Sequence, residues 1–329
     1  MEHYLIIILI ALALLFDFLN GFHDSANVVA TMISSRAMTP TAALLIASLA
    51  NFIGPFVFGV AVAKTIGQDV ASPSSITIAV VLAALLSASI WNIITWFFGI
   101  PSSSSHALIG GIIGAVLVGS GWQVLKFEGL ALVGIALFLS PVLGFLIGQL
   151  AMRISMWSVR NATPKANLFF KYGQIPTAFT LALSHGTNDA QKTMGIITMG
   201  LVVLGYQELF VVPWWVIVAS ATSIGIGTAA GGWRIIHTLG GKFYKIRPIH
   251  SFTSQLSSML VIVTASLLGG PVSTTHVVSS AIIGVGAAQR KSQVRWGVMG
   301  DILVAWFLTV PVSAGFAAGL YFLIDYLIP

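Results

Sequence analysis

The sequence predicts an all-α polytopic membrane protein, with about ten transmembrane segments in two inverted-topology repeats that contain broken helices. Three observations lead there: a scarcity of charge, long apolar stretches, and motifs that occur twice. Charged residues make up 7% of the 329 residues and hydrophobic residues 57%, whereas an ordinary soluble domain is about 25% charged. The 15 basic and nine acidic side chains cannot cover a soluble core of this size. Lipid is therefore the solvent for most of the chain.

Apolar stretches of the length needed to cross a bilayer, roughly 17–25 residues, follow one another along the chain. We expect five in a first repeat, residues 1–160, and five in a second, residues 161–329. The expected segments are 4–35 (broken), 41–63, 76–98, 102–120 and 129–152, then 172–205 (broken), 211–232, 252–270, 272–288 and 296–327. The first lacks a basic leader region and a cleavage site, which favours a retained span over a signal peptide. Residues 76–120 fit either two crossings or a re-entrant hairpin.

The basic residues are unevenly distributed between the loops. If the loop 153–171 is cytoplasmic, 12 of the 15 lie on that side; only Lys64 and Lys126 lie on the other, and Lys192 is inside a segment. An excess of Lys and Arg marks cytoplasmic loops. We therefore expect an integral protein of a bacterial or archaeal plasma (inner) membrane with both termini outside. The pI of about 9.7 does not indicate a nucleic-acid partner, because the chain has no basic module for one.

Two motifs recur at a nearly constant offset. GFHDS at residues 21–25 returns as GTNDA at 186–190, and PSSSSH at 101–106 returns as PVSTTH at 271–276. Each half has an odd number of expected segments, so the halves should insert with opposite topology. Inverted repeats bind substrate near the midplane at the repeat interface, as secondary transporters do. Because no hydrolase pattern accompanies the motifs, we expect no enzyme.

The first motif puts polar residues inside an apolar segment. A carboxylate at the bilayer centre costs about 2.5–3.5 kcal/mol on insertion scales, so Asp24 and its counterpart Asp189 should face a cavity or a partner. Gly21 is expected to let the helix unwind and expose carbonyls to a cation. Asn20 and Asn27 add hard oxygen ligands of the kind that Na⁺ or Mg²⁺ accepts.

The second motif contains Lys192, the one lysine inside an expected span, at the position that corresponds to Asn27. Its ammonium can neutralise Asp189, contact an anionic substrate, or fill a site that a metal cation occupies in related proteins; the sequence does not separate these roles. A purely structural i,i+3 ion pair is the alternative. Asp17 has no counterpart in the other half, and a polar kink explains it as well as a binding site does.

The two Ser/Thr-rich loops each precede a Gly-rich helix. Ser and Thr are good N-caps, and a helix N-terminus presents free N–H groups and the positive end of the helix dipole. Two such ends that converge would hold a tetrahedral oxyanion, whereas ordinary capping of two short helices is the alternative. The hydroxyls expected to bind substrate belong to Ser103, Ser104, Ser105, Ser273, Thr274 and Thr275.

Four histidines also lie in the repeated motifs: His23, His106, His185 and His276. Histidine titrates near neutrality, so we expect a proton carrier among them, although an isolated histidine in an apolar protein is more often a packing residue. No pair of the four has a metal-ligand spacing within one helix, and the chain has no cysteine. We therefore expect no tightly bound cofactor or structural metal.

Together these motifs resemble those of the inorganic phosphate transporter family, often called the PiT family. The resemblance rests on GFHDSANVVAT at 21–31, SHGTND at 184–189 and the two Ser/Thr-His loops, and it covers essentially the whole chain. It implies an inverted-repeat transporter, acting as a homodimer, that moves inorganic phosphate with H⁺ or Na⁺ and holds it at the Ser/Thr loops. Carried onto this sequence, the residues lining the ion and substrate site are Asp24, Asn27, Asn188 and Asp189.

Two positions depart from the sodium-coupled members, which tend to have asparagine where this chain has His23 and Lys192. The chain is more similar to the bacterial proton-linked branch, which implies H⁺ as the coupling ion and a neutral metal–phosphate complex, with Mg²⁺ a candidate metal, as the cargo. We expect Lys192 at the phosphate site, and Asn20 and His23 beside the aspartates at the coupling-ion site. Sodium-coupled phosphate symport, sulfate transport and a passive anion channel remain alternatives.

Overall fold

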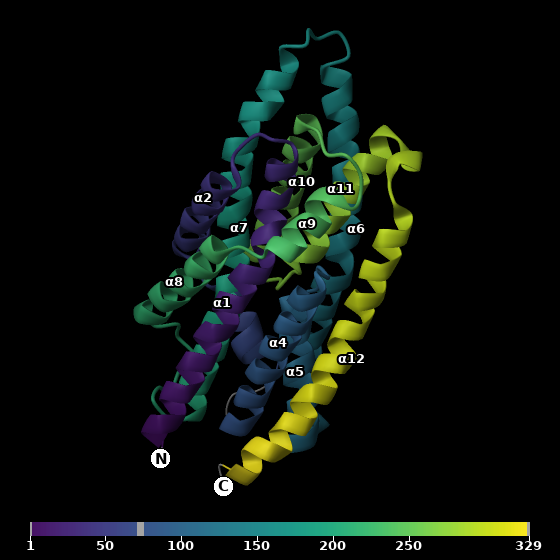
Figure 1. The fold of residues 1–329 in the computed structure, drawn as a ribbon. Helices are drawn as coiled ribbons and strands as arrows, with labels where there is room; N and C mark the ends of the chain where they lie inside the picture. Colours follow the sequence, from purple (N-terminus) through teal and green to yellow (C-terminus); the bar gives the residue numbers. More distant parts are fainter. Residues whose placement is uncertain (1, 71–75, 328–329) are drawn as a thin grey trace.

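The computed structural model describes residues 2–70 and 76–327, and these form helices joined by turns, with no strand among them (Figure 1). The helices of the first half are α1 (Glu2–Ser34), α2 (Pro40–Ile53), α3 (Ala61–Lys64), α4 (Ile78–Phe98), α5 (Ser104–Gly119) and α6 (Phe127–Ser158). Those of the second half are α7 (Ala166–Val203), α8 (Trp214–Ala230), α9 (Trp233–Gly241), α10 (Pro248–Leu267), α11 (Thr274–Gln289) and α12 (Trp296–Leu327). The all-helical fold class is confirmed.

Several of these helices match the dimensions of a bilayer. By length and composition α1, α4, α6 and α12 can each cross a membrane, and two bent pairs bring the number to six. The bends are 72° between residues 40–56 and 61–69, and 68° between α8 and α9. Large apolar side chains on the outer faces are exposed, for example Phe138 at 65% and Phe307 at 69%, as lipid contact requires. The chain is therefore an integral membrane protein.

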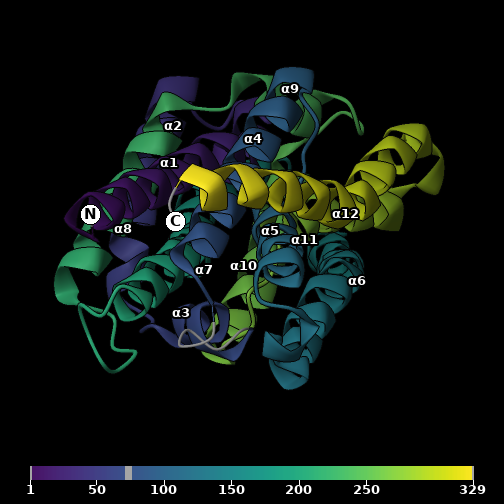
Figure 2. The same cartoon turned by 90° about the horizontal axis from the view of Figure 1, so that it is seen from below.

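The same order of elements occurs in both halves. Each has a long helix, a bent pair, two hairpin helices and a second long helix with an internal proline, Pro141 in α6 and Pro311 in α12. The halves interleave: α5 packs against α12, α11 against α6, α1 against α8 and α2 against α7 (Figures 1 and 2). The centre of the molecule is thus built from both halves.

The breaks expected within the first segment of each half do not occur. Helix α1 continues through Gly21 and α7 through Gly186. A Cβ atom at Gly21 would lie 2.3 Å from the carbonyl oxygen of Ile224 in α8, and one at Gly186 would lie 2.3 Å from that of Asn51 in α2. These glycines allow two helix backbones to approach closely. The expectation that unwinding at Gly21 exposes carbonyls to a cation is therefore wrong.

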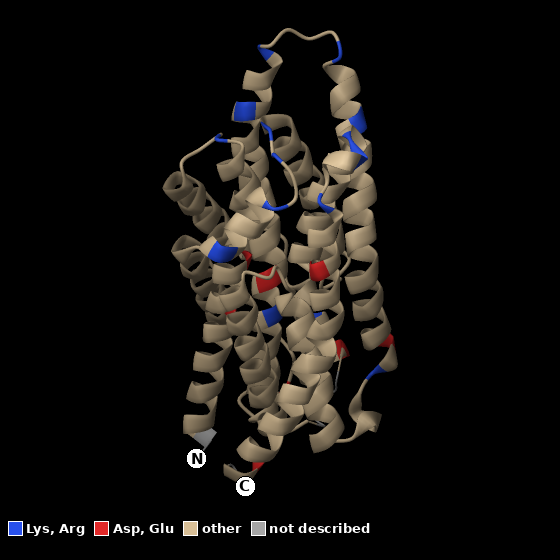
Figure 3. Cartoon of the chain, turned by 45° about the vertical axis from the view of Figure 1, so that its right-hand side comes forward, with Lys and Arg blue, Asp and Glu red and all other residues tan. Residues whose placement is uncertain are grey.

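Charge is concentrated at one end of the bundle. Figure 3 shows Lys and Arg gathered toward the end that carries the connection between α6 and α7, with both termini at the opposite end. By the positive-inside rule we expect the basic end to face the cytoplasm. The placement of both termini outside stays a prediction.

Replacing the packing glycines tests this explanation. Gly21→Ala or Gly186→Ala pushes a methyl group into a neighbouring backbone that cannot rotate away, so we expect a destabilisation of about 1–3 kcal/mol. The control is Gly315→Ala in α12, where a Cβ atom meets nothing within 4 Å; it should be neutral or slightly stabilising, because alanine favours helix. Thermal unfolding in detergent is the measurement. Equal melting temperatures for all three variants would contradict close packing at these two positions.

Candidate substrate and ion site

The second helix of each hairpin begins with the same cap. The Ser103 hydroxyl accepts a hydrogen bond from the backbone N–H of His106 at 3.1 Å, and the Ser273 hydroxyl accepts one from that of His276 at 3.2 Å. These are N-caps of α5 and α11. Ser103 and Ser273, both expected to bind substrate, thus use their hydroxyl oxygens to start the two helices.

The two hairpin tips touch each other. The Ser105 hydroxyl donates to the Val272 carbonyl at 3.1 Å, so the first tip is bonded to the second. The imidazole rings of His106 and His276 lie 4.4 Å apart, and Trp306 of α12 stacks on His276 at 3.7 Å. The N-termini of α5 and α11 therefore converge at the centre of the molecule.

Two carboxylates face this junction. The Thr274 hydroxyl is 3.2 Å from Asp24 Oδ2 and 3.2 Å from Asp189 Oδ2, and the Thr275 hydroxyl is 3.0 Å from Asp24 Oδ1. Asp24 and Asp189 are 2% and 0% exposed. Thr274 has one proton, so it can satisfy only one of the two carboxylates at a time. Two buried carboxylates this close together need a positive charge beside them.

Lys192 supplies that charge. Its side chain is fully buried, and its ammonium donates to the carboxylate of Asp189 and to the hydroxyl of Ser105. A third contact reaches the Val272 carbonyl at 3.3 Å. The ammonium has three donors, and they contact α7 and both hairpin tips. The sequence left three roles open for Lys192. The structure shows one of them, the ion pair with Asp189.

Asn27 makes the matching contact in the first half. Its amide donates to the Thr275 hydroxyl at 3.0 Å, in the hairpin of the second half, whereas Lys192 donates to Ser105 in the hairpin of the first. Corresponding positions of α1 and α7 thus hold opposite hairpins, one through an amide and the other through an ammonium. Asn20 adds a further link, because its Oδ1 atom accepts from the Ser104 hydroxyl at 2.6 Å.

His23 and Asn188 also occupy corresponding positions, but only His23 contacts the carboxylates. Its Nδ1 atom lies 2.8 Å from Asp24 Oδ1, and its Nε2 atom lies 3.2 Å from the Thr95 hydroxyl in α4. Asn188 instead donates to the Ser266 hydroxyl in α10 at 2.9 Å. Asn188 therefore joins α7 to α10 through its amide nitrogen.

His185 has a larger role in the structure than the sequence suggested. Its Nε2 atom is 3.0 Å from Asp189 Oδ2 and 3.8 Å from Asp24 Oδ2, and its Nδ1 atom is 3.1 Å from Asn51 Oδ1. It was expected only as one of four possible proton carriers. The i,i+4 spacing of His185 and Asp189 puts both residues on one helix face. That spacing is the sequence feature from which this contact could have been predicted.

Three of these residues can also hold a cation. Asp24, His185 and Asp189 each offer one ligand atom, and these atoms lie within 4.8 Å of one another. Carboxylate oxygens suit Na⁺ or Mg²⁺. The Lys192 ammonium already contacts Asp189, so a metal ion bound here must share that carboxylate with it or replace it.

A third aspartate lies outside this network. Asp17 in α1 is fully buried, and neither of its carboxylate oxygens has a hydrogen-bond partner among the described residues. The hydroxyl of Thr193, which lies beside it in α7, is also buried without a partner there. Asp17 therefore differs from the two aspartates at the hairpin tips, each of which contacts a hydroxyl and a nitrogen-containing side chain.

A closed, charged site at the centre of a lipid-facing helical bundle is typical of a membrane transport protein. The sequence profile of the Phosphate transporter family matches residues 20–317. The chain is 46% identical over 323 residues to a probable low-affinity inorganic phosphate transporter of Rhizobium meliloti (strain 1021), covering 98% of this chain and 97% of that one. Identity to a protein of the same description from Bacillus subtilis (strain 168) is 44% over 325 residues, with the same coverage.

The fold has a counterpart among solved structures. A structure described as the sodium-dependent phosphate transporter superposes with a TM-score of 0.88 and 26% sequence identity, covering 98% of this chain and 99% of that one. The chain therefore belongs to the phosphate transporter family, which confirms the resemblance seen in the motifs. Phosphate is the substrate of that family, and the relatives are described as transporters rather than as enzymes.

The Asp189–Lys192 pair can be tested through stability. Lys192→Met removes the counter-charge of a buried carboxylate, and we expect it to destabilise the protein by about 3–5 kcal/mol. Adding Asp189→Asn to Lys192→Met should recover most of that loss, since no charge is then left unpaired. Lys171→Met, at a partly exposed position of the same helix, is the control and should change little. If Lys192→Met melts like the unmodified protein, Lys192 does not compensate Asp189.

Proposed function

We propose that the chain is a secondary active transporter that imports inorganic phosphate across the inner membrane by symport with protons. The observation that carries this proposal is the closed junction of the hairpin tips, where two helix N-termini and four hydroxyls surround two aspartates and one lysine. The descriptions of the relatives support phosphate as the cargo.

The chemistry of the junction favours phosphate over sulfate. Free N–H groups at helix N-termini, hydroxyls of Ser104, Ser105, Thr274 and Thr275, and the Lys192 ammonium can all donate to a tetrahedral oxyanion. Carboxylates can only accept. At neutral pH phosphate carries at least one proton that it can donate to a carboxylate, whereas sulfate carries none and would be repelled.

Net charge supports symport. Two carboxylates and one ammonium leave a charge of −1 when the imidazoles are neutral, so an entering phosphate anion needs accompanying positive charge. Protons on His23 or His185 can provide it, because each ring contacts a carboxylate. A Mg²⁺–phosphate complex would bring the charge with the cargo, and the carboxylate oxygens are suitable ligands for it.

The fixed ammonium favours protons over sodium as the coupling ion. The structural relative is described as sodium-dependent, and sodium coupling is the second candidate. Here the Lys192 ammonium, which is part of the chain, contacts Asp189, where a bound Na⁺ would have to compete with it. His23 further fills one side of Asp24 with an imidazole that can itself gain and lose a proton.

We infer that residues 1–160 and 161–329 form two inverted repeats of five segments each, and that two copies of the chain form a homodimer. The recurrence of element order and the reciprocal contacts of Asn27 and Lys192 with opposite hairpins support the repeat. In such folds, alternating access is achieved when one bundle moves against the other around a fixed site. The hairpin tips would part on one side while they stay closed on the other.

The proposal is tested by labelled phosphate uptake into proteoliposomes with an imposed inward proton gradient, in sodium-free buffer with Mg²⁺. We expect accumulation above equilibrium that a protonophore abolishes and excess sulfate does not. Asp24→Asn should lower uptake by about 100-fold, because a buried charged partner is lost from the site. The control is Asp325→Asn, near the end of α12 and outside the site, which should transport normally.

Each other outcome identifies an alternative. Accumulation only with a sodium gradient would establish sodium coupling, and competition by sulfate would overturn the phosphate selectivity argued here. Phosphate flux that depends on neither the proton gradient nor the sodium gradient would indicate a passive channel. Normal uptake by Asp24→Asn would show that the hairpin junction is not the transport site.

Asp17 gives a more specific test of proton coupling. An ionised carboxylate buried without a partner costs several kcal/mol, and neither carboxylate oxygen of Asp17 has a hydrogen-bond partner among the described residues. We therefore infer that Asp17 holds a proton in this state and takes part in proton transfer. Asp17→Asn should keep the protein folded and retain phosphate exchange at equal concentrations, yet lose proton-driven accumulation. Unchanged accumulation would exclude Asp17 from the proton path.

A further inference from the structure

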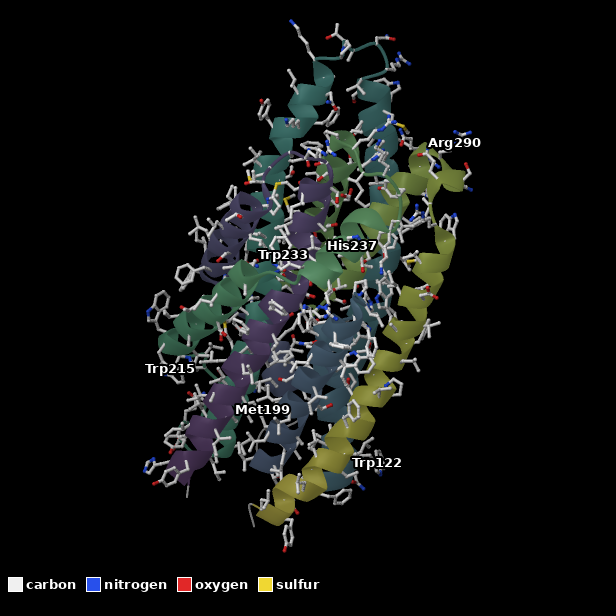
Figure 4. The ribbon with its side chains drawn as sticks, viewed as in Figure 1. Trp122, Met199, Trp215, Trp233, His237 and Arg290 are labelled. Atoms are coloured by element: carbon white, nitrogen blue, oxygen red, sulfur yellow. The ribbon has the colours of Figure 1, made fainter. Side chains whose placement is uncertain are left out.

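An open surface cavity lies away from the hairpin junction, between the end of α4 and helix α9. It measures about 440 Å³. The lining residues that matter here are three with basic side chains and three with aromatic ones: Arg234, His237, Lys242, Phe97, Phe98 and Trp233. Figure 4 shows Trp233 and His237 on α9, on the side of the molecule where α4 ends.

The amphipathic sequence of α9 creates this cavity. The helix follows a 68° bend after α8, and Ile235, Ile236 and Leu239 are buried against the bundle. Arg234 and His237 consequently lie on the exposed face. A short helix with an apolar face inward and basic residues outward is typical of the boundary between a bilayer and water.

Arg234 is held in place rather than freely solvated. Its guanidinium donates to the Phe97 carbonyl at the end of α4 and lies 5.2 Å from the ring centre of Trp96 and 4.8 Å from that of Phe97. These contacts fix the orientation of the group. Arginine has five N–H donors, and the carbonyl of Phe97 engages Nη1, so donors remain to face a ligand.

The positive charge of the cavity is not a requirement of the fold. Arg234 and Lys242 are cationic, and none of the lining residues in the described chain is acidic. The corresponding bend in the first half, residues 61–69, carries one Lys, Lys64, and one Asp, Asp69. The same architecture therefore forms without a basic cavity. The positive-inside rule accounts for basic residues at this end of the bundle, but not for their grouping with three aromatic rings around one cavity.

We propose that this cavity binds the phosphate group of an anionic phospholipid. The aromatic side chains at the rim favour a lipid over free phosphate. Phe97, Phe98 and Trp233 are 54%, 66% and 51% exposed. The acyl chains and glycerol backbone of a phospholipid would pack on these rings, whereas free phosphate would make no apolar contact with them. Basic pockets at the edge of transmembrane helices on the positively charged side bind anionic head groups. The site is separate from the hairpin junction and does not depend on which ion drives transport.

Native mass spectrometry of the full chain tests the proposal. The protein is released from bilayers that contain phosphatidylglycerol and phosphatidylcholine, and the lipid that stays bound is identified and titrated. We expect preferential retention of phosphatidylglycerol. Lys242→Gln should weaken it about fivefold, the effect of one basic residue near an anionic lipid. Lys64→Gln, at the corresponding bend of the other half, is the matched control and should leave it unchanged.

Lys242 is the primary variant because the structure gives it no hydrogen bond to the described chain, whereas Arg234 also holds the end of α4. Arg234→Lys keeps the charge but loses the planar contact with the rings, and should weaken retention less than Arg234→Gln. Equal retention of the two lipids, or equal loss in Lys242→Gln and Lys64→Gln, would overturn the site. In bilayers of phosphatidylcholine alone, Lys242-dependent binding of inorganic phosphate would assign the cavity to free phosphate and overturn the lipid.

Discussion

A carboxylate moved from water into a bilayer must find a counter-charge, and Asp189 finds one in Lys192, one turn further along the same helix. The arrangement of the centre follows from that pair. The ammonium has two donors left, and these contact Ser105 and Val272, so charge compensation and the joining of the hairpin tips are one interaction. A transporter must release such contacts to open. The strength of this junction therefore sets both the stability of the closed state and the free energy that substrate binding has to offset.

Close packing allows such a centre to exist. Lipid supplies no hydrophobic force between helices, so association depends on backbones that approach closely and on polar links. Gly21 lets α1 approach α8 closely, and Gly186 lets α7 approach α2 closely. Within this packing Asp24 and Asp189 share Thr274. The glycine that precedes each aspartate by three residues thus positions it without unwinding the helix.

The sequence was most informative where physical constraints leave one solution. Segments 76–98 and 296–327 agree closely with α4 and α12, because a bilayer fixes both the length and the polarity of a span. The repeated motifs identified Asp24, Asp189 and Lys192, which the structure brings together. The prediction of helix unwinding at Gly21 was wrong, because glycine permits both unwinding and the close approach of two helices. Which of the two occurs depends on the neighbouring helix, and the local sequence does not show that helix. Helix α9 was missed because nine residues with a buried apolar face give too short a pattern to separate from a loop.

The halves share an architecture but not their charges, and this difference carries the functional argument. At corresponding positions Asn27 and Lys192 hold opposite hairpins, one neutral and one cationic. In a fully symmetric site the two carboxylates would be equivalent, and two cations would be needed to neutralise them. With Lys192 fixed beside Asp189, one of those charges is covalently part of the chain and cannot be transported. The remaining carboxylate, Asp24, has His23 as its neighbour. In the proposed proton symport, the mobile positive charge at this site is a proton shared between an imidazole and the cargo, and the asymmetry of one residue pair would be the physical basis for that coupling ion.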